Sequence, residues 1–319
     1  MKTAFRSTYG GPEIVTIKEV PVPVPKENEV LIKVHATTVN RSDCHILTGK
    51  PFPMRLFTGL FKPKSSATGT DFAGQVEATG KNVSSFKIGD RLMGFRGILP
   101  IKSHAEYMLL TENTASKITI SIPSHLQYHE AAACLEGAFY AAGNTLLNLK
   151  SGQNAMVYGA TGAIGTAYLQ YLKYYGIHTT AVCKIENAEL VKSLGAEKII
   201  DYTNEDFTKD DERYDYVFDA VGKSSFAKCK HLLKPKGIYT SAGGAENLLL
   251  VLITPLFGGR KVVFKTFNVR TGLQFIHKMI EQQTLKPVID RIYSLDQIGE
   301  AFTYVSTGQK VGNVVIKME

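Results

Sequence analysis

Hydrophobic and polar positions alternate in short stretches over about the first 120 residues, and clusters of Gly and Pro separate these stretches. Alternation with a period of two is typical of half-buried strands, and Gly/Pro clusters are typical of turns. The pattern predicts strands at Val15–Val20, Val30–Val39, Asp71–Ala78 and Arg91–Phe95. This part of the chain is therefore expected to be mainly β.

The pattern changes near Ser124, where short apolar runs begin to alternate with longer stretches of helical period. The predicted strands are Asn154–Tyr158, Thr179–Cys183, Lys198–Ile200, Tyr214–Val221, Gly237–Ser241 and Lys261–Phe267. Helices between them end at residues that stop helices, such as Gly176 after Ile164–Tyr175. A further helix at Thr271–Gln283 and a last strand at Val314–Met318 follow. Alternation of this kind predicts an α/β fold with a parallel sheet covered on both faces.

Composition describes a folded protein, because 44% of the 319 residues are hydrophobic and 21% are charged. The longest nearly apolar run, Leu248–Phe257, is too short to cross a bilayer, and the first residues, MKTAFRSTYGG, lack the apolar core of a signal peptide. We therefore expect a cytoplasmic protein without a transmembrane segment. The four cysteines form no Cys-x-x-Cys pair, which disfavours a zinc ribbon and a disulfide framework.

The charge is moderately basic, with 37 Lys and Arg against 29 Asp and Glu and a formal net charge of +8. The lysines are scattered and form no stripe with interleaved stacking aromatics, so nucleic-acid binding is not expected. An anionic small ligand explains the positive charge better.

A glycine-rich loop follows the predicted strand Asn154–Tyr158 and leads directly into a helix. A dinucleotide site needs one Gly where the backbone approaches a pyrophosphate and another where helix packs on strand, and Gly162 and Gly165 have these positions. The helix N-terminus adds free N–H donors. The loop residues predicted to contact the cofactor are Gly159, Ala160, Thr161, Gly162, Ala163 and Ile164. The alternative is a glycine-rich turn that binds nothing.

The choice of cofactor is made about 20 residues after the loop, where an acidic side chain would bind the ribose hydroxyls of NADH. Cys183 stands there instead, followed by Lys184, which would attract a 2′-phosphate. The sequence thus favours NADPH, with Lys184, Asn187 and Tyr202 around the phosphate. Glu186 weakens this interpretation, and the alternative is that Lys184 is only solvated.

Six ordered motifs extend over nearly the whole chain: KEVPVPVPKENEVLIKVHATTVNRSDCHILTG, GTDFAGQVEATGKNVSSFKIGDRLMGF, VYGATGAIGTA, LVKSLGAEKIIDYTNEDF, YDYVFDAVGKSSF and GNVVIK. Together they resemble the zinc-independent, quinone-oxidoreductase-like branch of the medium-chain dehydrogenases/reductases. The resemblance implies an N-terminal, chaperonin-10-like (GroES-like) β domain that the C-terminal segment completes, over residues 1–123 and 268–319. A Rossmann domain over residues 124–267 is implied between them.

The resemblance also bears on metal binding. In zinc alcohol dehydrogenases of this architecture, a ligand Cys stands where VHATTVN ends, and a His-Glu pair follows the Gly of the next motif. This chain has Asn40 and Thr70-Asp71 at these positions. Amide and hydroxyl groups replace thiolate and imidazole poorly in a tetrahedral zinc site, so no metal is predicted.

Without zinc, conjugated acceptors are the easier substrates, because hydride can add at carbon while charge spreads to an oxygen held by hydrogen-bond donors. Asn40 matches the family's active-site Asn and is expected to donate to the substrate oxygen or to the nicotinamide ribose; the alternative is a cap on a helix at Ser42–Leu47. His45, where many relatives carry Tyr, is expected to relay the proton. A packed or solvent-facing histidine is the alternative.

Further cofactor contacts follow from the resemblance. Val221 and Gly222, after the fourth Rossmann strand, and Ala242 and Gly243, after the fifth, are assigned to nicotinamide contact. Asn313 in VGNVV is a candidate near the cofactor, or else a turn residue.

Three segments depart from the plain family pattern. Pro51–Lys64 mixes large apolar with basic residues and is expected to be either a substrate lid or, together with Leu248–Phe257, a membrane-docking surface. For Leu248–Phe257 the simpler expectation is burial against a partner subunit or the substrate site. Glu136–Tyr140 stands where relatives have small residues and a Thr near the nicotinamide phosphate.

The function that the resemblance implies is that of an NADPH-dependent, metal-independent reductase of quinones or α,β-unsaturated carbonyls, acting as a homodimer on a small-molecule substrate. One alternative is a zinc-independent alcohol or aldehyde reductase that acts on a simple carbonyl. The other is a crystallin-like NADPH-binding protein without important turnover.

Overall fold

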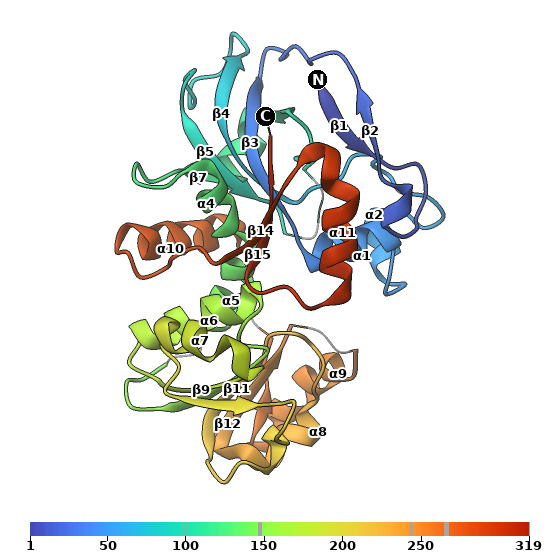
Figure 1. The fold of residues 1–319 in the computed structure, drawn as a ribbon. Coiled ribbons are helices and arrows are strands. Elements are labelled where there is room, and N and C mark those ends of the chain that lie inside the picture. The colour runs from blue at the N-terminus through green and yellow to red at the C-terminus, as the bar shows by residue number, and fades with distance from the viewer. Residues whose placement is uncertain (98, 100, 146–148, 243–244, 265–267, 319) are drawn as a thin grey trace. The chain divides into compact units, whose positions relative to one another are not determined.

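The chain forms two compact units, seen in the computed structural model of Figure 1, which describes all residues except 98, 100, 146–148, 243–244, 265–267 and 319. Unit 1 comprises Met1–Glu136, Asn268–Glu281 and Lys286–Glu319. Unit 2 comprises Gly137–Phe267 and Gln282–Leu285. The two ends of the chain thus share one unit. The predicted domain ranges, 1–123 with 268–319 and 124–267, stay predictions.

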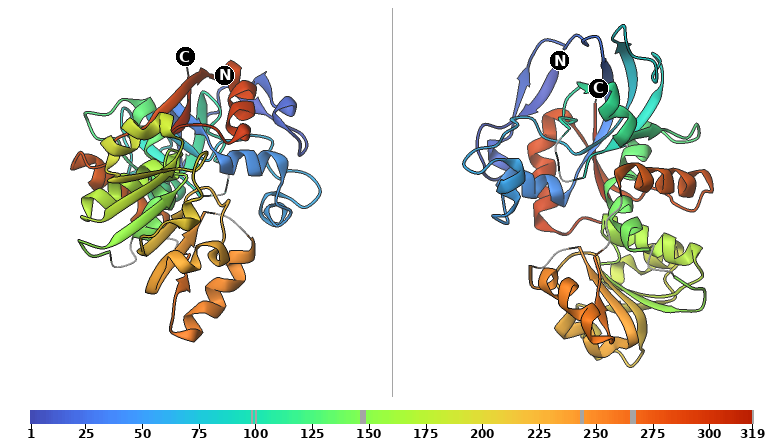
Figure 2. Two further views of the ribbon diagram at one scale, coloured as in Figure 1. Left: turned by 60° about the horizontal axis from the view of Figure 1, so that its bottom comes forward. Right: turned by 180° about the vertical axis from the view of Figure 1, so that it is seen from behind.

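Unit 1 contains a seven-stranded sheet in the order β14-β15-β3-β4-β5-β7, in which β6 also pairs with β3. Its strands are β3 (Glu29–Val39), β4 (Asp71–Thr79), β5 (Arg91–Phe95), β6 (Tyr107–Thr111), β7 (Thr119–Ser121), β14 (Ile289–Ser294) and β15 (Asn313–Lys317). A separate hairpin joins β1 (Lys2–Phe5) to β2 (Thr16–Glu19). The C-terminal β15 runs beside β3 (Figures 1 and 2), and the two strands pair antiparallel with Val314 opposite Val39. The C-terminal segment therefore completes the β domain.

One apolar core holds unit 1 together. Strands β3 and β4 bury Val34 and Phe72 against Phe302 of α11. The helical elements of this unit are η1 (Pro12–Ile14), α1 (Arg41–Thr48), α2 (Met54–Thr58), α3 (Glu112–Ile118), α4 (Tyr128–Ala133), α10 (Val269–Glu281), η6 (Leu295–Gln297) and α11 (Ile298–Thr307). Helix α5 (Glu136–Thr145) begins at the residue where the two units divide.

Unit 2 contains a six-stranded sheet in the order β10-β9-β8-β11-β12-β13, in which every pair is parallel. The strands are β8 (Asn154–Tyr158), β9 (His178–Cys183), β10 (Lys198–Asp201), β11 (Tyr214–Asp219), β12 (Leu233–Ser241) and β13 (Lys261–Val262). The order reverses at β8, which is the switch point of a Rossmann sheet. The predicted α/β fold, with a GroES-like β domain and a Rossmann sheet, is confirmed.

Short helical segments connect the strands of unit 2. They are α6 (Ala163–Tyr174), η2 (Ile185–Asn187), α7 (Ala188–Leu194), η3 (Phe207–Lys209), α8 (Phe226–Cys229), η4 (Lys230–Leu232), α9 (Ala245–Ile253) and η5 (Thr254–Phe257). Over the described residues, no helix of either unit is long and apolar enough to cross a membrane.

Three strand boundaries differ from the prediction by two residues or more. Strand β11 ends at Asp219 and not at Val221, because the Asp219 carboxylate takes the next backbone N–H groups out of the ladder. Strand β12 begins already at Leu233 and includes Pro235, where its pairing with β11 is irregular. Strand β13 is limited to Lys261–Val262, and residues 265–267 of the longer predicted strand lie outside the described residues.

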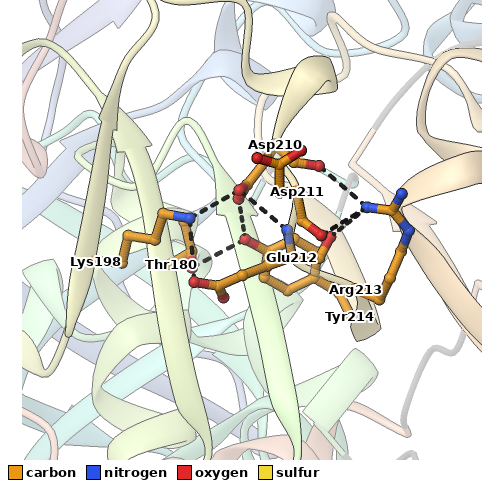
Figure 3. A network of polar contacts seen from close by, with 7 residues as sticks. All are labelled: Thr180, Lys198, Asp210, Asp211, Glu212, Arg213 and Tyr214. Carbon is orange, nitrogen blue, oxygen red and sulfur yellow. Dashed lines mark hydrogen bonds and ion pairs between the residues drawn. The ribbon is translucent and has the colours of Figure 1, made fainter.

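A polar network joins the amino ends of β10 and β11 to β9 (Figure 3). Lys198 Nζ lies 2.7 Å from Asp210 Oδ1 and 3.1 Å from Glu212 Oε1. The Tyr214 hydroxyl donates to Asp210, and its oxygen lies 3.1 Å from Thr180 Oγ1, which can donate to it. Hydrogen bonds to a charged group are stronger than neutral ones. The network therefore stabilises the amino ends of these strands, which lie opposite the strand end that carries the glycine-rich loop.

Candidate active site

The glycine-rich loop at the carboxyl end of β8 is a tight turn into α6. Gly159 has φ of +78°, and a Cβ there would lie 2.5 Å from Val221 Cγ1. A Cβ on Gly165 would lie 2.2 Å from the Gly159 carbonyl oxygen. The loop can therefore close against both α6 and the end of β11 only with glycine at these two positions.

Gly162 is under no such packing constraint. The nearest atom to a Cβ built there is the Gly159 carbonyl oxygen, at an ordinary contact distance of 3.7 Å. Gly162 is the N-cap residue of α6 and offers no side-chain cap to the first-turn N–H groups. A bare backbone that borders open space at a helix N-terminus is what a pyrophosphate requires. The loop thus fits the phosphates of a dinucleotide.

Asp219, the last residue of β11, shapes the neighbouring strand end. Its Oδ1 accepts hydrogen bonds from the backbone N–H groups of Val221 at 3.1 Å and Gly222 at 2.8 Å. Its Oδ2 accepts three more, from Ser224 N at 2.9 Å and from the Tyr239 and Ser241 hydroxyls at 3.1 Å each. Sequence reasoning missed this residue, although an acid at the start of an Asp-Ala-Val-Gly turn was a usable signal.

The end of β9 carries no acidic side chain. Cys183 is 1% exposed, and burial raises the pKa of its thiol to about 11, so it stays neutral and does not repel a phosphate. Lys184 Nζ lies 3.6 Å from Glu186 Oε1, and both side chains are exposed to solvent. Such a pair is weak, so Lys184 stays available to a phosphate dianion.

Three other predicted cofactor residues lie in the same unit. Asn187 closes η2, half-buried, and Tyr202 follows β10 with an exposed fraction of 45%. Ala242 is exposed after β12, and its N–H donates to the Asp219 carbonyl at 2.8 Å. Gly243 lies outside the described residues. In the parallel sheet of unit 2, the carboxyl ends of the strands therefore carry the predicted loop after β8 together with the ends of β9 and β11.

In unit 1, Asn40 stands between β3 and α1. Its backbone N–H donates to Asp43 Oδ2 at 2.9 Å, which fixes the start of the helix. Arg6, 1% exposed, fixes the other end by donating to the carbonyls of Ile46 at 2.5 Å and Leu47 at 2.9 Å. The helix that carries Asn40 and His45 is therefore held at both ends.

The Asn40 side chain is 3% exposed, and its amide Nδ2 donates to Thr38 Oγ1 and, at 3.2 Å, to Asp71 Oδ2. Asp71 also accepts hydrogen bonds from Thr38 N at 2.8 Å and Thr37 Oγ1 at 3.1 Å. Antiparallel pairing of β3 with β4 brings these residues together. Both amide N–H groups are thus committed, and the side chain also forms a capping box with Asp43 at the start of α1, as the helix-cap alternative predicts.

These donors do not suit zinc. The Asp71 carboxylate is filled by four hydrogen bonds, from two hydroxyls, one backbone N–H and the Asn40 amide. His104, buried beside Thr38, has both ring nitrogens bonded, to Thr68 Oγ1 at 2.8 Å and to the Thr38 carbonyl at 3.0 Å. Across the described part of the chain, no three His, Cys, Asp or Glu side chains are grouped to hold a metal ion.

Three carboxyl groups lie buried in unit 1, at 2% exposure for Asp43, 0% for Asp71 and 5% for Glu136. Burial raises the pKa of Asp71 to about 7 and that of Glu136 to about 8, and burial with both neighbouring carboxylates raises that of Asp43. The Ser42 hydroxyl donates to Glu136 Oε1. Burial also lowers the pKa of Lys310, whose charge favours ionised Glu136, to about 8. This cluster therefore retains protons at neutral pH.

His45 is half-buried on α1, and its Nδ1 bonds the Lys50 carbonyl at 2.8 Å. A carbonyl only accepts, so Nδ1 carries the proton and the neutral ring presents Nε2 as an acceptor. Burial lowers the pKa of His45. A ring held in this way can give a proton at Nε2 only from its minor, charged form.

Asn313, the first residue of β15, turns its amide inward. Its Nδ2 donates to the Val288 carbonyl at 3.1 Å, and its backbone N–H donates to the same oxygen at 2.8 Å. These hydrogen bonds are the ones expected of the alternative interpretation, in which Asn313 is a turn residue. Its proximity to a cofactor stays a prediction.

Two family models match the chain: the alcohol dehydrogenase GroES-like domain over residues 26–123 and the zinc-binding dehydrogenase domain over residues 194–316. The chain belongs to the medium-chain dehydrogenases/reductases, in the zinc-independent, quinone-oxidoreductase-like branch. The resemblance seen in its motifs is thereby confirmed.

Among individual relatives, the chain is 31% identical to the 2-methylene-furan-3-one reductase of Solanum lycopersicum, over 99% of this chain and 79% of that protein. It is 30% identical, with the same coverage, to the chloroplastic NADPH-dependent alkenal/one oxidoreductase of Arabidopsis thaliana. The solved quinone oxidoreductase of Coxiella burnetii superimposes with a TM-score of 0.85 at 26% identity, over 100% of this chain and 99% of that one.

Proposed function

We propose that this protein is an NADPH-dependent, metal-independent reductase of quinones or α,β-unsaturated carbonyls. The observation that carries the proposal is the phosphate cradle at Gly159–Gly165, at the switch point of a parallel sheet. The proposal is supported by the names of the relatives, a furanone reductase, an alkenal/one oxidoreductase and a quinone oxidoreductase, which all refer to the reduction or oxidation of conjugated carbonyl compounds.

The cofactor is held by unit 2. First-turn N–H groups of α6 bind the pyrophosphate, and Lys184 with Asn187 and Tyr202 surrounds the 2′-phosphate, beside the neutral Cys183. Val221, Gly222, Ala242 and Gly243 contact the nicotinamide end. The Asp219 carboxylate supports this by holding the backbone of the β11 loop in one conformation.

Bound NADPH supplies a hydride, with its electron pair, to the β-carbon of an enone or to a quinone, and one proton completes the reduced product. His45 relays that proton: its Nδ1 keeps the bond to the Lys50 carbonyl while Nε2 takes a proton from solvent and passes it on. Asn40 contributes its carbonyl oxygen, since its N–H groups are committed: one lone pair serves the capping box with Asp43, and the other accepts from a ribose hydroxyl. Asn313 is proposed as a further contact near the cofactor.

Metal independence rests on the donor set. The Asn40 amide and the filled Asp71 carboxylate offer no vacant thiolate or imidazole ligand where zinc relatives bind their metal. Hydrogen bonds then stabilise the negative charge on the substrate oxygen. This stabilisation is enough for a conjugated acceptor, whose charge is delocalised, but less effective for a simple ketone.

We further propose a homodimer in a reducing compartment, the cytoplasm. The four cysteines, Cys44, Cys134, Cys183 and Cys229, are all free and buried, in agreement with a thiol-reducing environment. Analytical ultracentrifugation of the purified protein tests the dimer.

Turnover with matched acceptors tests the proposed function. NADPH consumption is followed with an alkyl enone, its saturated ketone and a benzoquinone, each at equal concentration. We expect turnover of enone or quinone and little of the saturated ketone. Equal rates on the saturated ketone would favour a simple carbonyl reductase, and tight NADPH binding without any turnover would favour a binding protein.

A further inference from the structure

The segment of unit 1 that follows α1 and includes α2, whose backbone is seen in Figure 1, carries a surface of large apolar side chains. We call it the 51–64 surface. Its apolar members are Phe52 (62% exposed), Leu56 (64%), Phe57 (56%), Leu60 (43%) and Phe61 (89%). Single exposed apolar side chains are ordinary on a protein surface, but five within ten residues form a patch that marks an interaction site.

The segment is a fixed scaffold that turns these side chains outward. Its inner residues Thr58 and Gly59 are buried. The Tyr9 hydroxyl lies 2.7 Å from Thr58 Oγ1 and donates to the Gly59 carbonyl at 2.6 Å. Lys64 N donates to the Thr58 carbonyl at 2.8 Å, and the Arg55 guanidinium lies 4.6 Å over the Tyr9 ring. Because the polar groups of the segment form contacts with the rest of unit 1, its apolar side chains are exposed to solvent.

Basic residues accompany the apolar side chains along the segment. Lys50, Lys62 and Lys64 are exposed in or beside it, and no Asp or Glu occurs between Asp43 and Asp71. An apolar surface with a basic rim is complementary to an anionic lipid bilayer, into which aromatic and Leu side chains insert while the cations meet headgroups.

We propose that the 51–64 surface is a peripheral membrane-docking site that binds bilayers containing anionic lipid. A second copy of the chain fits this surface less well, because a two-fold contact would bring the same three lysines against one another. The proposal does not depend on the proposed reductase activity.

Vesicle co-sedimentation of the full chain tests the proposal. The vesicles are phosphatidylcholine alone or phosphatidylcholine with phosphatidylserine. We expect binding to the anionic vesicles that weakens at high salt, because screening removes the headgroup attraction. The double variant Phe57→Ser/Phe61→Ser is expected to lower the partition coefficient at least about tenfold, since two inserted aromatic side chains are lost.

Matched controls separate docking from general surface changes. Val24 and Ile88 lie on unit 1 with exposed fractions of 83% and 70%, outside the 51–64 surface, so Val24→Ser/Ile88→Ser is expected to bind as the parent does. Likewise, Lys62→Gln/Lys64→Gln is expected to weaken binding about tenfold, and the exposed Lys87→Gln to leave it unchanged. Circular dichroism verifies that each variant is folded.

Three results would overturn the proposal. The first is failure of the parent protein to bind either kind of vesicle. The second is equal loss of binding in the Val24→Ser/Ile88→Ser control. The third is a shift of the oligomeric state by Phe57→Ser/Phe61→Ser with unchanged vesicle binding, which would assign the surface to a second copy. None of these results depends on enone or quinone turnover.

Discussion

Replacing Glu136 by Gln tests whether a buried neutral carboxyl makes the stability of unit 1 depend on pH. Glu136 is 5% exposed, and burial raises its pKa from 4.5 to about 8. The folded protein then holds a proton that the unfolded chain releases. The free energy of unfolding must therefore fall as the pH rises from about 4.5 toward 8. Gln has the same shape and can still accept from the Ser42 hydroxyl, but it carries no titrating proton.

The size of the pH-dependent change in stability follows from the raised pKa of Glu136. Each pH unit between the two pKa values costs the folded state about 1.4 kcal/mol, so a rise from about pH 5.5 to 7.5 removes up to about 3 kcal/mol through Glu136. Glu136→Gln removes this contribution, while Asp43, Asp71, Lys310, His104 and the exposed groups still titrate in the variant. The variant should gain stability over the parent as the pH rises, by about 1 kcal/mol per unit.

Urea unfolding at about pH 5.5, 6.5 and 7.5, followed by far-ultraviolet circular dichroism, measures the two pH dependences. Because the chain has no Trp, circular dichroism is the direct probe. The control is Glu19→Gln, an exposed carboxyl on β2 of the same unit, which should keep the slope of the parent. Parallel slopes for the parent and Glu136→Gln would refute the reasoning, because Glu136 would then be ionised in the folded protein.

Four further substitutions probe the cofactor unit. The Cβ of Gly165→Ala would lie 2.2 Å from the Gly159 carbonyl oxygen, so this variant should lose about 1–3 kcal/mol of the free energy of unfolding. The Cβ of Gly162→Ala would have 3.7 Å of space, so this variant should keep its stability but bind NADPH at least about tenfold more weakly in calorimetry. Lys184→Glu should raise the Kd for NADPH by about 10–100-fold and change that for NADH by less than about threefold; a parallel change would show that Lys184 does not meet the 2′-phosphate. Asp219→Asn replaces an acceptor of five hydrogen bonds and should lower the denaturation midpoint by an amount equivalent to about 2 kcal/mol, and an unchanged midpoint would contradict its role in the loop.

Local sequence patterns predicted much of the fold. Strands β5 and β8 were predicted at their observed boundaries, because polar turn residues on both sides limit each run. The start of β12 was missed, since Pro235 argues against a strand and only the irregular pairing with β11 accommodates it. The glycine-rich loop is likewise local: its strand, turn and helix follow one another in the chain.

The candidate site of unit 1 was less predictable because its partners are distant in sequence. The family resemblance identified Asn40 and His45 as candidate site residues. It did not predict the hydrogen bonds that determine which of their side-chain atoms can donate or accept. Asp71 reaches Asn40 across 31 residues, and Glu136 meets Ser42 across 94. No local periodicity reports such contacts. They arise from the pairing of β3 with β4 and from the start of α5, which only the tertiary structure shows.

Isotope transfer from labelled NADPH tests the central claim most directly. The protein is incubated with an alkyl enone and NADPH deuterated at the transferring position, with and without a metal chelator, and the product is analysed by NMR. Hydride transfer to a conjugated acceptor without metal predicts deuterium at the β-carbon, solvent hydrogen at the α-carbon and no effect of the chelator. Deuterium at the carbonyl carbon, or loss of transfer with the chelator, would contradict the account.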